Sequence, residues 1–146
     1  MSTGLATLLL AHLIATTAMA GLIWFVQVVH YPLFARIDPA GFVAYEQAHT
    51  TRTAFVVGVP MATEGFTALG LLLVTDDLGL VGPVAGLLLL GAVHASTVLL
   101  QVPCHRKLSS THDPATIDRL VRTNWIRTLG WTSRVGLATW LLATQL

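Results

Sequence analysis

Four long apolar segments run along the chain, and short polar connections separate them. A helix needs about 20 residues to cross the hydrocarbon core of a bilayer, so each segment is long enough to do so. None of them carries more than two charged side chains. The pattern therefore predicts four membrane-spanning helices, in residues 5–34, 54–74, 78–103 and 125–146.

Prolines mark the expected starts of the second and fourth helices, ahead of their apolar segments. Pro39 and Pro114 suit the first turn of a helix, and Asp113 suits an N-cap. From there, FVAYEQAHTTR and ATIDRLVRTNWIR are amphipathic and predict cytoplasmic extensions of helices two and four. Pro60 is expected to kink helix two. We predict an all-α fold, an integral membrane up-down-up-down four-helix bundle that forms one domain over residues 1–146.

The first segment has one feature of a secretory signal peptide. The small residues of ATTAMA precede Gly21, as at a cleavage site. However, no lysine or arginine precedes the apolar run, and the run continues well beyond this point. We therefore expect the first helix to be retained.

The overall composition also indicates a membrane protein. Hydrophobic residues make up 54% of the chain and charged residues 10%, against about a quarter in soluble domains. The mean hydropathy is +0.72. A formal net charge of +1, with no basic patch interleaved with aromatic residues, argues against a nucleic-acid partner. The single cysteine, Cys104, rules out an internal disulfide.

The charges of the connections predict the orientation in the membrane. Asp76 and Asp77 lie between the second and third segments, where no basic residue occurs. The other two connections carry the lysine and arginine residues, so the positive-inside rule places them in the cytoplasm. Both termini are then outside the cytoplasmic (inner) membrane. The basic residues are Arg36, Arg52, Arg106, Lys107, Arg119 and Arg122.

Each predicted helix carries polar residues along one face. Glutamine, histidine, glutamate and arginine are costly in contact with lipid, so we expect these four faces to converge on the interior of the bundle. The faces consist of Thr16, Ile23, Gln27 and His30; of Glu46, His49, Thr53, Pro60 and Glu64; of His94, Thr97, Gln101 and His105; and of Asn124, Arg127, Trp131 and Arg134.

Three of these residues lie near the middle of the predicted membrane spans. Each is twelve positions from a basic residue of a connection, which corresponds to a depth of roughly 18 Å. A lone charge at this depth costs several kcal/mol, and an opposite charge offsets much of that cost. We predict that Glu64 and Arg134 form an ion pair and that His94 lies within hydrogen-bonding reach. The cluster could serve as a proton relay or only hold the helices together.

A second polar layer lies at the cytoplasmic ends of the helices. His30 ends the first helix, His105 ends the third, and Glu46 and His49 form an E-x-x-H pair near the start of the second. Such a pair places a carboxylate and an imidazole on adjacent turns that face one cavity. Four such side chains suit Fe, Zn, Cu or Mn. The alternative is that the histidines only cap helix ends or lie among lipid headgroups.

Other polar and aromatic residues could complete a substrate or cofactor site. Asn124 and Arg127 are candidates to position a substrate. In a variant of the same hypothesis, a haem binds between His30 and His105, with Arg122 and Arg127 near its propionates. The candidate cofactor contacts are Gln27, Tyr31, Tyr45, Gln101, Arg122 and Trp131.

Four stretches of sequence resemble a group of small bacterial four-helix membrane proteins. They are GLIWFVQVVHYPLF, YEQAHTTR, QVPCHRKL and LVRTNWIRTLGWTSR, and the resemblance covers most of the chain. The layout is also similar to that of the anthrone-oxygenase-like membrane family, whose members are associated with oxidation of aromatic polyketides. That likeness rests on the number of helices and on a first helix in which Gly21 leads to Pro32. It implies membrane oxidoreductase chemistry and transfers no site residue.

The leading hypothesis is a metal- or cofactor-dependent membrane enzyme, an oxidoreductase that acts on a hydrophobic small molecule in a pocket open to the cytoplasm. In it, Glu64, His94 and Arg134 support catalysis. An alternative is a proton-coupled carrier or small channel that uses the same three residues. A third is a non-catalytic subunit of a membrane complex or a homo-oligomer, with close helix contacts at Gly65, Ala68, Gly70, Gly86 and Gly91.

Overall fold

The computed structural model describes residues 2–146, and every element in that range is helical. Four long helices follow one another along the chain, at Thr3–Phe34, Pro39–Leu78, Val81–Leu108 and Pro114–Ala143. Short π- or 3-10-helical turns divide the first three into several elements. The elements are α1 (Thr3–Phe25), η1 (Val26–His30), α2 (Tyr31–Phe34), α3 (Pro39–Leu71), η2 (Leu72–Val74), α4 (Thr75–Leu78), α5 (Val81–Ser96), η3 (Thr97–Gln101), α6 (Val102–Leu108) and α7 (Pro114–Ala143).

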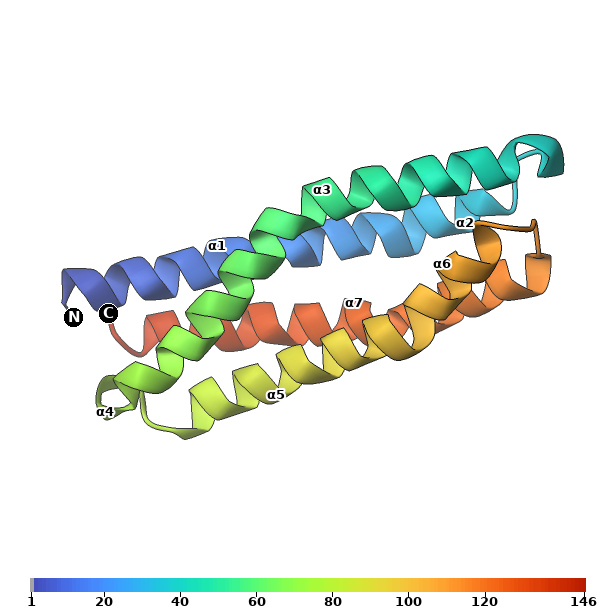
Figure 1. Ribbon diagram of the computed structural model, residues 1–146. Coiled ribbons are helices and arrows are strands. Elements are labelled where there is room, and N and C mark those ends of the chain that lie inside the picture. Colours follow the sequence, from blue (N-terminus) through green and yellow to red (C-terminus); the bar gives the residue numbers. More distant parts are fainter. Residues whose placement is uncertain (1) are drawn as a thin grey trace.

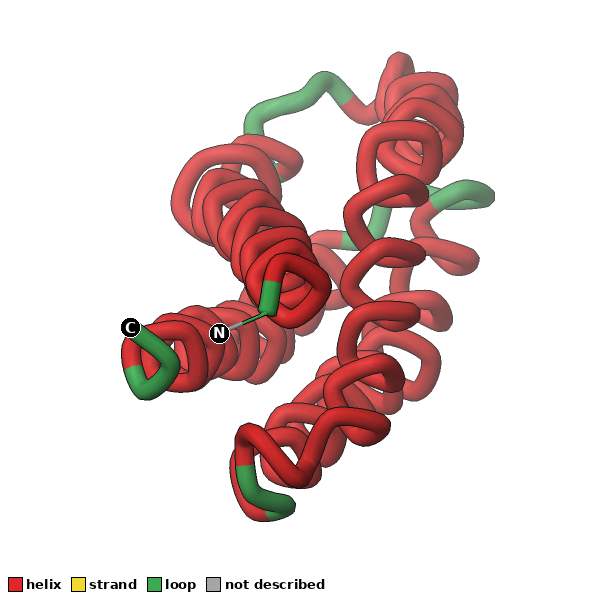
Figure 2. The backbone as a smooth tube through the Cα atoms, turned by 90° about the vertical axis from the view of Figure 1, so that its left-hand side faces the viewer, coloured by secondary structure: helices red, strands yellow, loops and turns green. Residues whose placement is uncertain are grey.

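Successive long helices run in opposite directions, and both termini lie at the same end (Figure 1). Helix α1 packs against α3 on one side and α7 on the other, while α5 packs against α7 and α3. Figure 2 shows the helices from the end that carries the termini. A cluster of buried aromatic and aliphatic side chains holds the opposite half together, and it includes Phe34, Phe42, Leu108, Leu120 and Trp131.

The predicted starts of the second and fourth helices are confirmed. Asp38 and Asp113 are the N-cap residues of α3 and α7, and Pro39 and Pro114 follow them in the first turn. The Asp113 carboxylate accepts a hydrogen bond from the amide of Ala115. Pro60 lies inside α3, which bends along its length in Figure 1. A proline inside a helix removes one backbone hydrogen bond and favours such a bend.

Asp113 gives the connection before α7 a pH-dependent contribution to stability. Hydrogen bonds from Lys107 and Thr116 lower the pKa of this carboxyl from 3.8 to about 2. The ionised form therefore stabilises the folded protein above about pH 4, and this contribution disappears as the pH falls toward about 2. Asparagine also caps helices but carries no charge. We expect an Asp113→Asn variant to have a lower midpoint temperature of unfolding than the wild type at neutral pH. The difference between the two midpoints should shrink between about pH 4 and pH 2.

Two π-helical turns, η1 and η3, each end two residues before a proline, Pro32 and Pro103. A π turn is closed by a bond to the fifth preceding residue, and the amides of Tyr31 and Val102 make such bonds to Val26 and Thr97. Pro32 and Pro103 come next and have no amide hydrogen to donate. The wider turn accommodates each proline within a continuous helix, and π turns are frequent at functional sites.

Among residues 2–146, three helical stretches are long and apolar enough to cross a membrane: Thr3–Phe34, Pro39–Leu78 and Val81–Leu108. The sequence pattern predicted four, and α7 does not reach the same hydropathy. The reason is that α7 contributes much of the polar interior. Asn124, Thr128 and Arg134 are at most 1% exposed, as is Trp131.

Candidate metal site

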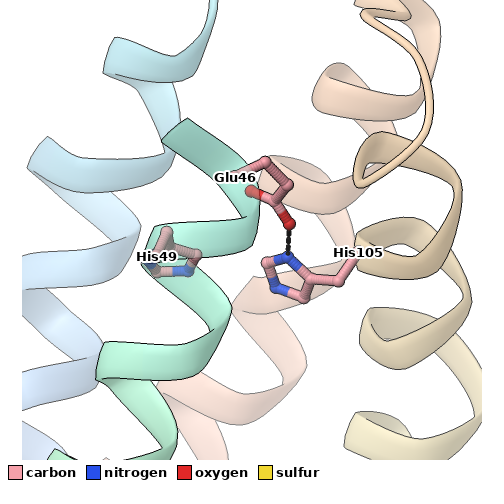
Figure 3. Close-up of side chains that lie close together, drawn as sticks. All are labelled: Glu46, His49 and His105. Atoms are coloured by element: carbon pink, nitrogen blue, oxygen red, sulfur yellow. Dashed lines mark hydrogen bonds and ion pairs between the residues drawn. The ribbon is translucent and has the colours of Figure 1, made fainter. Parts of the chain in front are cut away.

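Adjacent turns of α3 provide the first two side chains of the candidate site. Glu46 and His49 are three residues apart and therefore leave the helix on the same side. Figure 3 shows both on α3, with His105 reaching toward them from α6. Atoms His105 Nδ1 and Glu46 Oε1 lie 2.6 Å apart. One ligand atom from each residue lies within 4.8 Å of the other two, so the three side chains could hold a metal ion.

Glu46 is the most enclosed member of this metal group, defined here as Glu46, His49 and His105. Its side chain is 0% exposed, whereas both imidazoles are half-buried. Within residues 2–146, its Oε2 atom has no hydrogen-bond partner. A buried carboxylate oxygen without a partner is costly, and a cation removes that cost.

The end of the first long helix places two more side chains beside the metal group. His30 Nε2 shares a hydrogen bond with His49 Nδ1 at 2.8 Å, and the Tyr31 hydroxyl shares one with His105 Nε2 at 2.8 Å. Ring centroids are 4.6 Å apart for His30 and His49, and 5.5 Å apart for His49 and His105. The expected gathering of His30, His49 and His105 is therefore confirmed. His30 makes its contact with the group through His49.

The haem variant does not fit this arrangement. His49 is hydrogen-bonded to His30 and packs beside His105, so its ring occupies space that a macrocycle between those two residues needs. Arg127 and Arg122 were expected to meet the propionates together. Instead they line two different cavities, of about 440 and 370 Å³. A haem between His30 and His105 would therefore require His49 to move.

The cavity of about 440 Å³ adjoins the metal group and lies among the first, second, third and fourth long helices. His49 and His105 both line it, as does Tyr31. A groove of about 320 Å³ on another side of His49 is lined by His30 and by Tyr45, which is 39% exposed. Most of the larger cavity has apolar walls, formed by Leu22, Ile23, Val26, Ala54, Val57, Met61 and Val102.

Gln27 and Asn124, both expected near a ligand, bind each other. Gln27 Oε1 accepts a hydrogen bond from Asn124 Nδ2 at 2.9 Å, and Gln27 Nε2 donates to the carbonyl of Val121 at 3.1 Å. These bonds tie the first long helix to α7. Gln101 and Arg127, in contrast, line the 440 Å³ cavity.

The predicted ion pair in the interior is confirmed. Arg134 Nε donates to Glu64 Oε1 at 2.9 Å, and the two side chains are 1% and 0% exposed. Trp131 Nε1 donates to the other carboxylate oxygen at 2.9 Å, and Arg134 Nη1 donates to the carbonyl of Gly86. The carboxylate of Glu64 is thus paired through both oxygens and joins α3 to α7.

The expected third member of this cluster, His94, is replaced by His12. Within the described residues, the only side-chain hydrogen bond of His94 is between Nδ1 and the carbonyl of Leu90 in its own helix, at 2.9 Å. His12 is buried, shares a hydrogen bond with Thr67 at 2.8 Å and lines a cavity of about 10 Å³ together with Arg134. The sequence contained a signal for His12, because it lies four residues before Thr16 on the same polar face.

The chain was also compared with known proteins. No protein-family model matches it, and neither curated proteins nor solved structures gave a match. The assignment of a function therefore depends on the arrangement of the chain's own residues.

Proposed function

We propose that this protein is a metal-dependent membrane enzyme, an oxidoreductase that acts on a hydrophobic small molecule. The observation that carries the proposal is the burial of Glu46 with an unpartnered oxygen beside two imidazoles. Buried carboxylates are normally paired or bound to metal. Here one oxygen faces His105, and the other is free to bind a cation.

The size of the metal group is compatible with one ion. Ligand atoms at about 2.1 Å from a metal lie about 3–3.5 Å from each other. In the structure the ligand atoms lie within 4.8 Å of one another, so only small side-chain movements are needed to reach that spacing. Two imidazoles and one carboxylate leave coordination positions open, which is the ligand set of many non-haem iron enzymes and of some catalytic zinc sites.

His30 and Tyr31 suit the role of outer partners that orient the ligands. An imidazole that binds a metal through one nitrogen usually donates a hydrogen bond from the other, and this fixes its tautomer and ring orientation. His30 is suited to be the outer partner of His49, with which it already shares a hydrogen bond. Tyr31 is the corresponding partner of His105 when the latter binds through Nδ1.

The substrate site in this proposal is the cavity of about 440 Å³, which adjoins the metal group. Its volume lies within the usual range for small-molecule sites, about 300–1,000 Å³, and its walls are mostly apolar. The carrier hypothesis has weaker support, because the cavity beside Arg134 measures only about 10 Å³. That is roughly the space of one water molecule.

We propose in addition that the four helices form an up-down-up-down bundle inserted in the cytoplasmic membrane, with both termini outside. Large apolar side chains remain exposed along the helices, as contact with lipid requires, and examples are Phe55, Phe66 and Leu88. The basic connections lie at the end of the molecule that carries the metal group. The site then faces the cytoplasm.

Elemental analysis of the purified protein tests the metal site. We expect about one equivalent of a transition metal in the wild type and a loss of most of it in His49→Ala and His105→Ala, because each removes one of three ligands. His94→Ala is the matched control, since His94 is half-buried and bonds only to its own helix.

The identity of the metal tests the reaction class. Iron, copper or manganese supports an oxidoreductase in which the metal itself carries electrons, whereas zinc alone contradicts that form of the reaction. Wild-type protein without metal after purification from metal-supplemented cells, or equal metal content in all three variants, contradicts the metal site itself.

A further inference from the structure

Arg127 is an unpaired cation beside the apolar 440 Å³ cavity. It is half-buried in α7, and within residues 2–146 it belongs to no ion pair. Its Nη1 donates to Asn124 Oδ1 at 3.2 Å, and its guanidinium lies 5.5 Å from the ring centroid of Trp131. Its Nε is buried and has no hydrogen-bond partner in the described part of the chain. These contacts hold the guanidinium in place without neutralising it.

The two buried carboxylates of the interior are engaged elsewhere. Glu64 is bonded to Arg134 and Trp131, and one oxygen of Glu46 is bonded to His105. An uncompensated cation within a membrane helix is costly unless an anion reaches it. A guanidinium pairs with a carboxylate through two parallel hydrogen bonds, which makes it selective for that group.

Gln101 lines the same cavity, and within residues 2–146 its side chain has an acceptor without a partner. Its Nε2 donates to Thr123 Oγ1 at 2.8 Å, and Thr123 Oγ1 donates in turn to the carbonyl of Arg119 at 2.8 Å. Because that hydroxyl hydrogen is already used, Thr123 must accept from Gln101, and this fixes the orientation of the amide. Gln101 Oε1 is therefore the atom left buried without a partner. It can accept a hydrogen bond from a ligand.

We infer that the 440 Å³ cavity binds an apolar molecule that carries an anionic group, a carboxylate or an ionised phenol. The anion pairs with Arg127, a hydroxyl group of the ligand donates to Gln101, and the apolar body lies against Ile23, Val57 and Met61. The inference builds on the proposed function, because this molecule is the substrate class of the metal-dependent reaction. It concerns binding alone, however, so it can be tested without metal.

The test uses 2-naphthoate and its neutral analogue 2-naphthalenemethanol as fluorescent probes. Binding is measured on chelator-treated protein in lipid nanodiscs, and the signal from empty nanodiscs is subtracted. We expect the wild type to bind 2-naphthoate at least about tenfold more tightly than the alcohol, as expected for a charge-assisted pair in an apolar site. Equal affinities for the two probes overturn the inference, and this measurement needs no variant.

Two arginine variants locate the anion site. Arg127→Gln should lower 2-naphthoate affinity about tenfold and leave the alcohol unaffected, whereas Arg127→Lys should retain part of the preference. Arg122→Gln is the control, since Arg122 is exposed on the same helix and lines another cavity. An equal loss in Arg122→Gln and Arg127→Gln contradicts the assignment. If Arg127→Gln does not fold, a lysine variant with no preference for the anion contradicts it as well.

The hydroxyl contact has its own comparison. The wild type should bind 6-hydroxy-2-naphthoate more tightly than 2-naphthoate, and Gln101→Leu should abolish the difference. A difference that persists in Gln101→Leu removes this residue from the site.

The metal analysis and the anion-binding measurement can contradict their hypotheses independently of each other. Protein that binds no metal but prefers 2-naphthoate contradicts the proposed enzyme and keeps the anion site. Protein that binds metal through His49 and His105 but shows no preference for the anion contradicts the inference alone.

Discussion

Arg134→Leu should destabilise the protein by about 3–5 kcal/mol, because it leaves Glu64 as a buried charge without its partner. Glu64→Leu should have a similar effect, since it leaves the guanidinium of Arg134 uncompensated. Both side chains are at most 1% exposed, so water cannot replace the lost contact. The measurement is unfolding in mixed detergent micelles, followed by circular dichroism.

The double variant separates a charge pair from two independent contacts. Leucine at both positions removes both charges, so we expect it to be more stable than the sum of the single effects predicts, with a coupling of about 2–3 kcal/mol. The double variant remains less stable than the wild type, because Trp131 Nε1 and the carbonyl of Gly86 lose their partners. A double variant whose loss of stability equals the sum of the two single losses contradicts the pairing.

An exposed pair on α7 provides the control for this cycle. Asp118 and Arg122 lie four residues apart, both are exposed, and both line the cavity of about 370 Å³ outside the interior. Exposed charges contribute little to stability because water solvates them in either case. The same cycle with leucine at these positions should show a coupling below about 1 kcal/mol.

The positions of these charges could be predicted because helix geometry is regular. A rise of about 1.5 Å per residue places Glu64 and Arg134 at one depth, and a turn of about 100° per residue places both on inward faces. The same two rules brought Glu46 and His49 to the level of His105. Four helices that each carry one polar face have few ways to bury all four faces.

His94 shows where this reasoning failed. The sequence placed His94, Gln101 and His105 on one face by assuming a uniform α-helix. The π-helical turn η3 ends at Gln101 and separates His94 from His105, and its extra residue shifts the rotation of everything that follows. Val93 is the inward-facing neighbour, at 1% exposed, and His94 lies about 100° away from it. Pro103 was the available signal for this turn.

The hydrogen-bond partners of the inward-facing residues could not be predicted from the sequence. Gln27 lies on the predicted inward face, but a helical pattern does not tell whether its amide meets a ligand or another helix. The structure assigns it to Asn124 and Val121. Arg127 lies on the same predicted face as Arg134, yet it pairs with no carboxylate among the described residues. The difference depends on which acidic side chain comes within about 4 Å, and that is set by packing.

Close helix contacts were predicted correctly at Gly70 and Gly86, where an added Cβ atom would lie 3.1 Å from Leu8 Cδ1 and 3.4 Å from Leu137 Cδ2, but not at two other glycines. Gly65 and Gly91 were expected to permit close approach, but a methyl group added at either position meets nothing within 4 Å. Gly130 of α7, which the pattern did not single out, lies against Val93 of α5. A Cβ atom at Gly130 would lie closer to Val93 Cγ2 than such atoms approach in proteins.

Gly130→Ala should therefore destabilise the protein by about 1–3 kcal/mol, in spite of the higher helix propensity of alanine. Val93 cannot easily move away, because it is 1% exposed and its branched side chain has few rotamers in a helix. The measurement is again unfolding in mixed micelles. Gly136→Ala on the same helix is the control, since its added methyl group meets nothing within 4 Å, and it should be neutral or slightly stabilising.

Truncation of the opposing side chain tests whether this steric contact is the cause. Val93→Ala removes the atom that the new methyl group would meet. Added to Gly130→Ala, it should restore part of the lost stability, although Val93→Ala alone is destabilising through the space that it leaves. If the two effects simply add, or if Gly130→Ala is as stable as Gly136→Ala, then α5 and α7 do not pack as closely at this point as the structure indicates.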